Sequence, residues 1–186
     1  TLDNVLFIGK NTPYHCCLYY PDHAAIQALV SQTIAQLKQQ QAPLEAVHYI
    51  YDERMLSSRT TSMQITIIDT APELNFSLYA LANSEEKAGY QAIQLQPNHV
   101  YFCATDNIAI RLYRRAKEQQ LKIGLNVWIV GIGDYDYSDL LVPSLTTVAF
   151  NYYQVGYQAV KKLLKRDLSS AEGTFEIKLR ESSQFL

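Results

Sequence analysis

Short runs of β-branched and aromatic residues alternate with longer amphipathic segments along almost the whole chain. Residues 100–103 (VYFC) and 127–132 (VWIVGI) are apolar or nearly so throughout, which is typical of strands that are buried on both faces of a sheet. Between such runs apolar residues recur at helical spacing, as at Ile26, Leu29 and Val30. The alternation predicts the α/β class, with a doubly wound, mostly parallel sheet covered by helices on both faces.

The same pattern predicts where the elements lie. Strands are expected at residues 2–8, 47–51, 76–80, 100–103, 127–132, 145–150 and 175–179, and helices at 24–40, 85–95, 106–119 and 153–165. Asp106 or Asn107 is expected to cap the third of these helices. Residues 59–70 are ambiguous, because their threonine and isoleucine content favours a strand whereas their place between two strands favours a helix.

Ligands of such sheets bind beyond the carboxyl ends of the strands, so the loops after the strands carry the candidate chemistry. These loops cover residues 9–14, 52–59, 81–84, 104–107 and 133–139. The sequence has no glycine-rich phosphate loop, no nucleophile elbow and no histidine pair at metal-ligand spacing. We therefore expect no catalytic residue, no metal, no cofactor and no enzyme activity.

Composition narrows the class of partner. The chain has 186 residues, which fits one domain or one two-lobed unit. Its 16 basic and 18 acidic residues give a net charge of −2, which argues against a nucleic-acid surface within these residues. Cys16, Cys17 and Cys103 are expected to be buried small hydrophobes in a reducing compartment. No apolar run approaches the ~20 residues that span a bilayer, so we expect no membrane contact and a cytoplasmic setting.

Six short segments carry a family pattern. They are residues 5–10 (VLFIGK), 88–90 (AGY), 100–110 (VYFCATDNIAI), 127–133 (VWIVGIG), 143–148 (PSLTTV) and 180–183 (RESS). In their content and order they resemble the LacI/GalR family of transcription regulators over nearly the whole chain. Residues 16–37 and 103–106 are also somewhat similar to the trehalose-operon repressors of that family.

The resemblance implies a periplasmic-binding-protein-like fold with two lobes. Residues 1–20 and 146–170 would form part of the first lobe, and residues 21–145 and 171–186 a complete second lobe. Nothing in the chain resembles the family's helix-turn-helix DNA-binding domain. Operator DNA would therefore be bound only through an N-terminal domain that is absent from this chain.

By the same resemblance, effector contacts are expected in the strand-end loops. Arg59 matches the arginine of the family's Arg-x-x-Gly-Phe element, whose guanidinium reaches effector oxygens, although Ser62 and Met63 replace its last two residues. The alternative for Arg59 is a solvated loop. Thr105 and Asp106 stand where the family has a sugar-contacting Asn-Asp pair. For Asp106 we favour the competing role of helix cap, and for Thr105 both roles stay open.

Four further residues complete the expected ligand site. Asp134 follows Gly133, which occupies the position of the family's hydroxyl-binding aspartate. Either Asp134 takes over that role, or the effector lacks the usual pair of hydroxyl contacts. Lys10 matches a basic position that faces the cleft and would suit a phosphorylated sugar, unless it is a solvated surface lysine. Asn83, in a strand-end loop, and Tyr20, whose ring could stack on a sugar, are the remaining candidates.

The function that the resemblance implies is sensing of a sugar or sugar-phosphate effector, and dimerisation, within a DNA-binding transcriptional repressor. We expect a homodimer through second-lobe helices, at the segments around Leu95, Leu112 and Tyr113 and the loop 138–141.

Two alternatives come from other classes. A periplasmic-type sugar-binding protein of a transport system would usually carry a secretory signal and lack the Thr146-Thr147 crossover and the Arg-Glu-Ser ending. An enzyme of the doubly wound class would need a catalytic constellation, which the loops do not contain.

Overall fold

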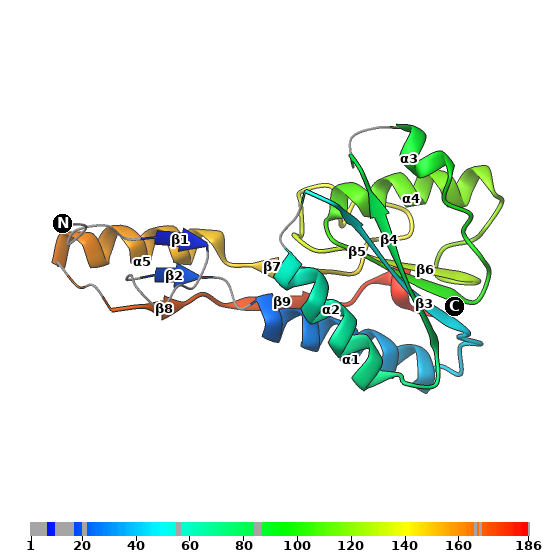
Figure 1. Ribbon diagram of the computed structural model, residues 1–186, viewed down its shortest axis with the longest axis horizontal. Helices are drawn as coiled ribbons and strands as arrows, with labels where there is room; N and C mark the ends of the chain where they lie inside the picture. Colours follow the sequence, from blue (N-terminus) through cyan, green and yellow to red (C-terminus); the bar gives the residue numbers. More distant parts are fainter. Residues whose placement is uncertain are drawn as a thin grey trace.

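A four-stranded parallel sheet forms the centre of the larger part of the molecule (Figure 1). In spatial order its strands are β4 (Asn75–Leu81), β3 (Ala46–Asp52), β5 (His99–Cys103) and β6 (Val127–Val130). One face carries α1 (Asp22–Gln39) and α2 (Ser57–Thr70), and the other carries α3 (Lys87–Gln91) and α4 (Asp106–Glu118). The doubly wound α/β class predicted from the sequence is confirmed.

The computed structural model describes residues 7–9, 17–19, 22–54, 57–83, 87–165, 167 and 169–185. At its other end lies a small parallel sheet of three short strands beside a helix (Figure 1). These elements are β1 (Phe7–Gly9), β2 (Cys17–Tyr19), β8 (Ala171–Glu172) and α5 (Tyr152–Lys165). β8 pairs with β2, so the small sheet includes two residues that the expected boundary assigns to the second lobe. The two-lobe division itself stays a prediction.

Two antiparallel strands run between the large and the small part (Figure 1). They are β7 (Thr147–Phe150) and β9 (Phe175–Lys178). After β9 the chain returns to the large part and forms the 3-10 helix η1 (Glu181–Ser183). There the indole Nε1 of Trp128 donates a hydrogen bond to the carbonyl of Gln184 at 3.2 Å, which fastens this end of the described chain to the sheet.

The core lies on both faces of the four-stranded sheet. Val47, Val100, Phe102 and Trp128 have no exposed surface, which explains why their strands read as apolar runs. Burial of a side chain of this size contributes roughly 1.5–3 kcal/mol to the free energy of unfolding. Cys103 is a buried free thiol, as expected.

The ambiguous stretch 59–70 lies within a helix, α2. Met63, Ile67 and Ala71 recur every four residues, and each is at most 2% exposed. This spacing places them on one helical face against the core. In a strand Ile65 and Asp69 would share that face, but both are exposed. Packing therefore overrides the strand preference of the threonines and isoleucines.

The helix expected at 85–95 is shorter in the structure, where α3 covers only Lys87–Gln91. Beyond it, polar side chains of α4 and of its C-cap residue satisfy the backbone of residues 91–95. Gln119 accepts from the N–H of Leu95 and donates to the carbonyl of Ile93, and Arg115 donates to the carbonyls of Gln91 and Ile93. These bonds replace the helical ladder, so the segment needs no further helical turn.

Candidate functional site

The carboxyl ends of the parallel strands bring four loops to one edge of the sheet. Asp52 ends β3, Asn83 follows β4, Thr105 follows β5, and Gly133 and Asp134 follow β6. The structure thus gathers at one edge the described residues that the sequence singles out after these strands.

A cavity of about 500 Å³ opens beside the loop that follows β6. A second cavity of about 570 Å³ adjoins it and shares Asp134, Ala149 and Phe150. The first is lined by Gly133, Asp134, Tyr135, Asp136, Tyr137, Ala149, Phe150 and Tyr152. Its walls therefore combine aromatic rings with carboxylates, at the point where β7 leads away from the large part.

Asp106 anchors the loop that forms one wall of this cavity. Its carboxylate is fully buried and accepts hydrogen bonds from Thr147 Oγ1 at 2.7 Å, Ser138 Oγ at 2.7 Å and the Tyr135 N–H at 3.0 Å. Burial raises the pKa of this carboxyl group, and the three hydrogen bonds oppose that rise. The contacts favour a structural role for Asp106, whose ligand role stays a prediction.

The helix cap assigned to Asp106 or Asn107 is wrong, because Thr105 caps α4. Thr105 has extended backbone angles, and its side chain accepts from the N–H of Ile108 at 3.3 Å. Asp106 is instead the first helical residue and turns its carboxylate toward the loop after β6. Because the Thr105 hydroxyl can donate while it accepts, the proposed ligand contact stays open for this residue.

Asp134 forms an ion pair at the end of β9. Its Oδ1 lies 2.8 Å from the guanidinium of Arg180, and the two side chains are about one-fifth exposed. The preceding Gly133 has φ +133°, a backbone conformation that side chains rarely adopt. An aspartate at position 133, where the family resemblance would place it, would be strained in this backbone, and the carboxylates that line the cavity are those of Asp134 and Asp136.

Arg59 lies at the start of α2 and binds Asp22 at the start of α1, with 2.8 Å between Nη2 and Oδ1. Arg59 does not lie in a solvated loop, because it belongs to α2 and its side chain is only 24% exposed. The ion pair holds the two helix starts together at the carboxyl edge of the sheet.

Asn83 belongs to a cluster that the sequence reasoning did not identify. Its Oδ1 accepts from Arg54 at 2.9 Å, and Arg54 also donates to both carboxylate oxygens of Asp52. Asp52 is only 3% exposed. The sequence signal for this cluster is the carboxylate of Asp52, which comes directly after the strand predicted at 47–51.

Other residues of the site were also missed. Thr147 and Phe150 come from the predicted crossover strand, Ser138 comes from the predicted dimer loop, and Tyr152 precedes a predicted helix. Only the tertiary structure brings them beside Asp106 and Asp134. Lys10 and Tyr20, which complete the sequence-based site, lie outside the described residues.

Two other kinds of feature are absent from the described part of the chain. No group of three or more His, Cys, Asp or Glu side chains there is placed to hold a metal ion. No helix among these residues combines the length and apolar character needed to cross a bilayer.

Comparison with known proteins gives matches in sequence. The family of periplasmic binding protein-like domains matches residues 45–176, which is more than half of the chain. The HTH-type transcriptional repressor CytR of Escherichia coli (strain K12) is 35% identical over 79 residues, which make up 42% of this chain and 23% of that protein. The ribose operon repressor of Haemophilus influenzae is 31% identical over 80 residues, 42% of this chain and 24% of that protein. The matched part thus spans about a quarter of these relatives.

Solved structures show the same fold. An uncharacterized protein from Actinobacillus succinogenes superposes with a TM-score of 0.78 at 18% identity, over 96% of this chain and 70% of that chain. A LacI family transcriptional regulator from Enterococcus faecalis V583 with bound ribose gives a TM-score of 0.75 at 19% identity, over 97% of this chain and 68% of that chain.

Proposed function

The chain belongs to the family of periplasmic binding protein-like domains and is similar to the effector-binding region of LacI/GalR-type regulators; on this premise we propose that it senses a sugar or sugar phosphate for a transcriptional repressor. The observation that carries the proposal is the cavity between the loop after β6 and strand β7, lined by Tyr135, Tyr137, Phe150 and Tyr152 and by the carboxylate of Asp134. The remaining part of such a repressor, with its DNA-binding domain, would act on an operator in the cytoplasm.

The chemistry of this cavity suits a sugar. Tyr135 is 40% exposed and Tyr152 is 51% exposed, so each can present ring surface to a ligand. Aromatic faces stack against the C–H faces of sugar rings, and carboxylates and amides bind the hydroxyl groups. A phosphorylated sugar would need a cation as well, for which Lys10 is the sequence-based candidate. The similarity to trehalose-operon repressors stays a prediction.

The geometry suggests how an effector would act. β7 and β9 connect the large part to the small part, and the Asp134–Arg180 ion pair joins the loop after β6 to the end of β9. A ligand held against Asp134 and Phe150 would thus change the contacts at the base of both connecting strands. Differential binding of this kind shifts the relative orientation of the two parts and, by reciprocal linkage, the affinity for an operator.

We further propose that the protein forms a homodimer through α4 and the loop that follows residue 138. In this loop Leu140 is 76% exposed and Val142 is 91% exposed. The hydroxyl of Tyr113 on α4 donates to the carbonyl of Pro143 at 2.9 Å, so helix and loop form one continuous surface. Exposed apolar side chains beside a fixed helix are typical of a protein interface.

Two apolar residues of the segments expected at this interface are buried in the core. Leu95 and Leu112 are 5% and 0% exposed, because they face the core between α4 and the sheet. The proposed interface therefore uses the exposed residues of these segments, and the homodimer stays a prediction.

The experiment is a calorimetric titration of this chain with ribose, glucose, trehalose, trehalose 6-phosphate and nucleosides, together with thermal unfolding. A ligand of the folded state at a hundredfold excess over its Kd stabilises by about 2.7 kcal/mol. Tyr135→Ala and Tyr152→Ala should weaken binding, since each removes a ring from the cavity. Tyr153→Ala is the matched control, because Tyr153 is 84% exposed and lines neither cavity. Absence of binding throughout the panel, or equal weakening by all three substitutions, would refute the proposal.

A further inference from the structure

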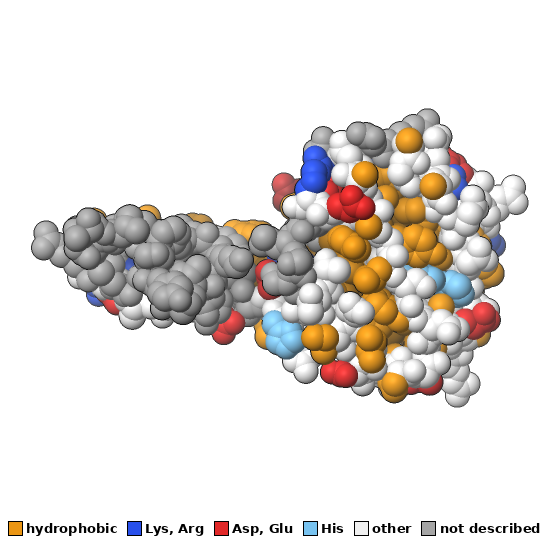
Figure 2. Space-filling view, viewed as in Figure 1, with side chains coloured by type: hydrophobic (Ala, Val, Ile, Leu, Met, Phe, Trp, Pro, Cys, Tyr) orange, Lys and Arg blue, Asp and Glu red, His pale blue; other side chains and the backbone are white. Residues whose placement is uncertain are grey.

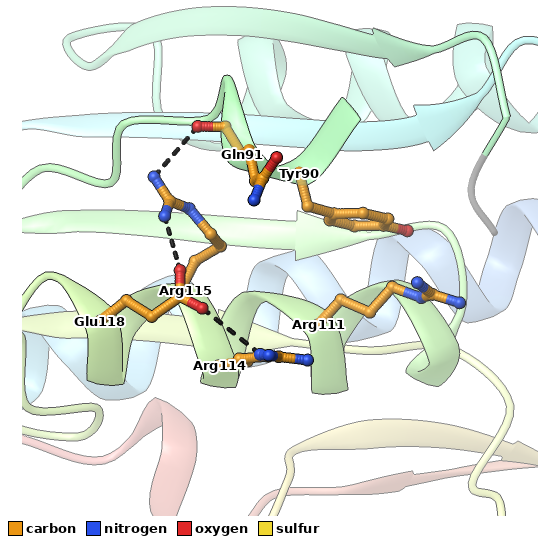
Figure 3. A pocket seen from close by; sticks show the side chains of 6 residues that line it. All are labelled: Tyr90, Gln91, Arg111, Arg114, Arg115 and Glu118. Atoms are coloured by element: carbon orange, nitrogen blue, oxygen red, sulfur yellow. Dashed lines mark hydrogen bonds and ion pairs between the residues drawn. The ribbon is translucent and has the colours of Figure 1, made fainter. Parts of the chain in front are cut away.

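A small pocket lies between α3 and α4 (Figure 3). It shares no lining residue with the cavity beside Asp134. Arg111, Arg114, Arg115 and Glu118 occupy one face of α4, because they follow one another at spacings of three, one and three residues. Tyr90 and Gln91 of α3 close the other side. The pocket has a volume of about 60 Å³, room for a single small group rather than a whole sugar.

The arginines of this pocket are held in different ways. Arg115 is only 14% exposed in its side chain and is fixed by the carbonyls of Gln91 and Ile93 and by Glu118, 2.7 Å away. Arg114 is 69% exposed and reaches the other oxygen of Glu118 at 3.3 Å (Figure 3). Arg115 thus has a full set of partners, whereas Arg114 keeps most of its N–H groups in solvent.

Arg111 contacts an aromatic ring but no carboxylate. Its guanidinium carbon lies 5.2 Å from the centre of the Tyr90 ring, and Tyr90 itself is 4% exposed and therefore fixed (Figure 3). Among the described residues no acidic side chain forms an ion pair with Arg111. Contact with the ring positions the guanidinium while its N–H groups stay available.

The charges of the pocket do not balance. Three guanidinium groups face one carboxylate, so three positive charges minus one negative charge leave an excess of +2. The hydrogen bond from Arg115 lowers the pKa of Glu118, which keeps that carboxylate ionised at neutral pH. Like charges three and four residues apart destabilise a helix, so an anion between Arg111 and Arg114 would relieve repulsion.

We infer that Arg111 and Arg114 form a binding site for a phosphate group, separate from the cavity beside Asp134. A guanidinium presents a planar fork of N–H donors that fits phosphate oxygens. A phosphate group carries about −1.5 to −2 charges at pH 7, which matches the excess in the pocket, whereas a single carboxylate would leave it positive. The pocket admits the phosphate alone, so inorganic phosphate and the phosphate of a larger ester share this chemistry.

The experiment is a calorimetric titration of the 186-residue chain at constant ionic strength, with inorganic phosphate, glucose 6-phosphate and glucose as separate probes. Phosphate and glucose 6-phosphate should each bind with saturation, and glucose should not compete with them. Binding of both probes identifies a general phosphate site, whereas binding of glucose 6-phosphate alone identifies a phosphate-ester site. Each outcome supports the inference only if the variants below weaken that binding.

Arg111→Gln and Arg114→Gln should each weaken phosphate binding about tenfold, the effect of one lost charge-assisted hydrogen bond. Lys117→Gln is the matched control, since it removes the same charge from α4 outside the pocket. Arg114 is mostly exposed, so its variant tests the inference even if Arg111→Gln fails to fold. Absence of saturable phosphate binding, equal weakening by Lys117→Gln, or binding of a polyglutamate peptide without phosphate would overturn it.

Discussion

The carboxylate of Asp106 holds together three segments that are far apart in the sequence. It accepts from Ser138 in the loop after β6 and from Thr147 at the start of β7, in addition to the Tyr135 N–H. Hydrogen bonds to a charged acceptor contribute roughly 1.5–3 kcal/mol each, so these bonds offset the burial of the charge. A Cβ on the neighbouring Gly131 would clash with Asp106 Oδ1, so glycine is required at that position.

His48 is a second buried polar residue, on the same face of the sheet as Tyr101. Its Nε2 lies 2.8 Å from Nδ1 of His99, and its own Nδ1 is buried without a hydrogen-bond partner. The ring stacks on Tyr101 at 4.6 Å and meets the edge of Tyr79 at 5.5 Å. Burial, followed by the charge of His99, lowers the pKa of His48 to about 4.

This lowered pKa predicts acid destabilisation. Between pH 6.5 and 4 the unfolded chain binds the His48 proton and the folded chain does not, so the free energy of unfolding falls as the pH falls through this window. Between pH 7.5 and 5.0 the contribution of His48 amounts to about 2 kcal/mol. Urea unfolding at the two pH values measures this effect. Between them, the free energy of unfolding of His48→Phe should fall by less than that of the parent protein, and the difference should match the contribution of His48.

Other groups also titrate in this range, so the comparison needs a second histidine. His23→Phe replaces an exposed histidine of α1 and should leave the pH dependence as it is in the parent protein. An unchanged pH dependence in His48→Phe would show that His48 does not resist protonation in the folded state.

At the scale of elements, α3 and α4 depend on side chains rather than on a shared helical ladder. Gln119, which caps the carboxyl end of α4, pairs with the Ile93 carbonyl and the Leu95 N–H of the segment after α3. Both partners are backbone groups beside buried apolar side chains, since Ile93 is 4% and Leu95 is 5% exposed. A buried backbone group that loses its hydrogen-bond partner lowers the free energy of unfolding by its full desolvation penalty.

We therefore expect Gln119→Ala to lower the free energy of unfolding by about 1–3 kcal/mol. The substitution removes one of the donors to the Ile93 carbonyl and leaves the Leu95 N–H without a protein partner. Chemical denaturation measures the loss. Lys117→Ala, an exposed change on the same helix, should shift stability by less than about 0.5 kcal/mol. Equal effects of the two substitutions would mean that solvent replaces the Gln119 contacts without cost.

For the molecule as a whole, two surfaces follow from the arrangement of its parts. The connecting strands β7 and β9 place the aromatic cavity where the large and small parts meet (Figure 1). Apolar side chains also gather on the face of the large part shown in Figure 2. The proposed dimer surface consists of α4 and the loop that carries Leu140 and Val142. It shares no residue with the lining of the aromatic cavity, so an effector and a second copy could bind at the same time.

The dimer proposal predicts a change of mass. Val142→Asp places a charge at a side chain that is 91% exposed in the isolated chain, which should leave folding intact but disfavour its burial between two copies. Sedimentation analysis should show a dimer for the parent protein and a monomer for this variant. Val160→Asp, on the exposed side of α5, should leave the mass of the dimer unchanged. A monomeric parent protein, or a dimeric Val142→Asp variant, would contradict the proposal.

The sequence by itself determined the class of fold and the position of most elements. Residues 100–103 and 127–130 are strands because each run is short, rich in β-branched and aromatic residues, and buried along its whole length. Helix α1 follows directly from its apolar stripe, of which Ile26, Leu29 and Val30 are buried. These features depend on neighbours along the chain, so local periodicity predicts them. The short family segments extended the prediction to a periplasmic-binding-protein-like fold, which the family match over residues 45–176 confirms.

Only the tertiary structure decided the ambiguous and polar positions. α2 is a helix because Met63 and Ile67 reach the core, Thr105 rather than Asp106 caps α4, and α3 ends early because Gln119 and Arg115 satisfy the backbone beyond it. Likewise, Asp134 meets Arg180 across 46 positions of the sequence. Each outcome depends on a contact between residues that are distant in the chain. The periodicity of the sequence does not predict such contacts, because the role of a polar side chain depends on the partner that lies beside it after folding.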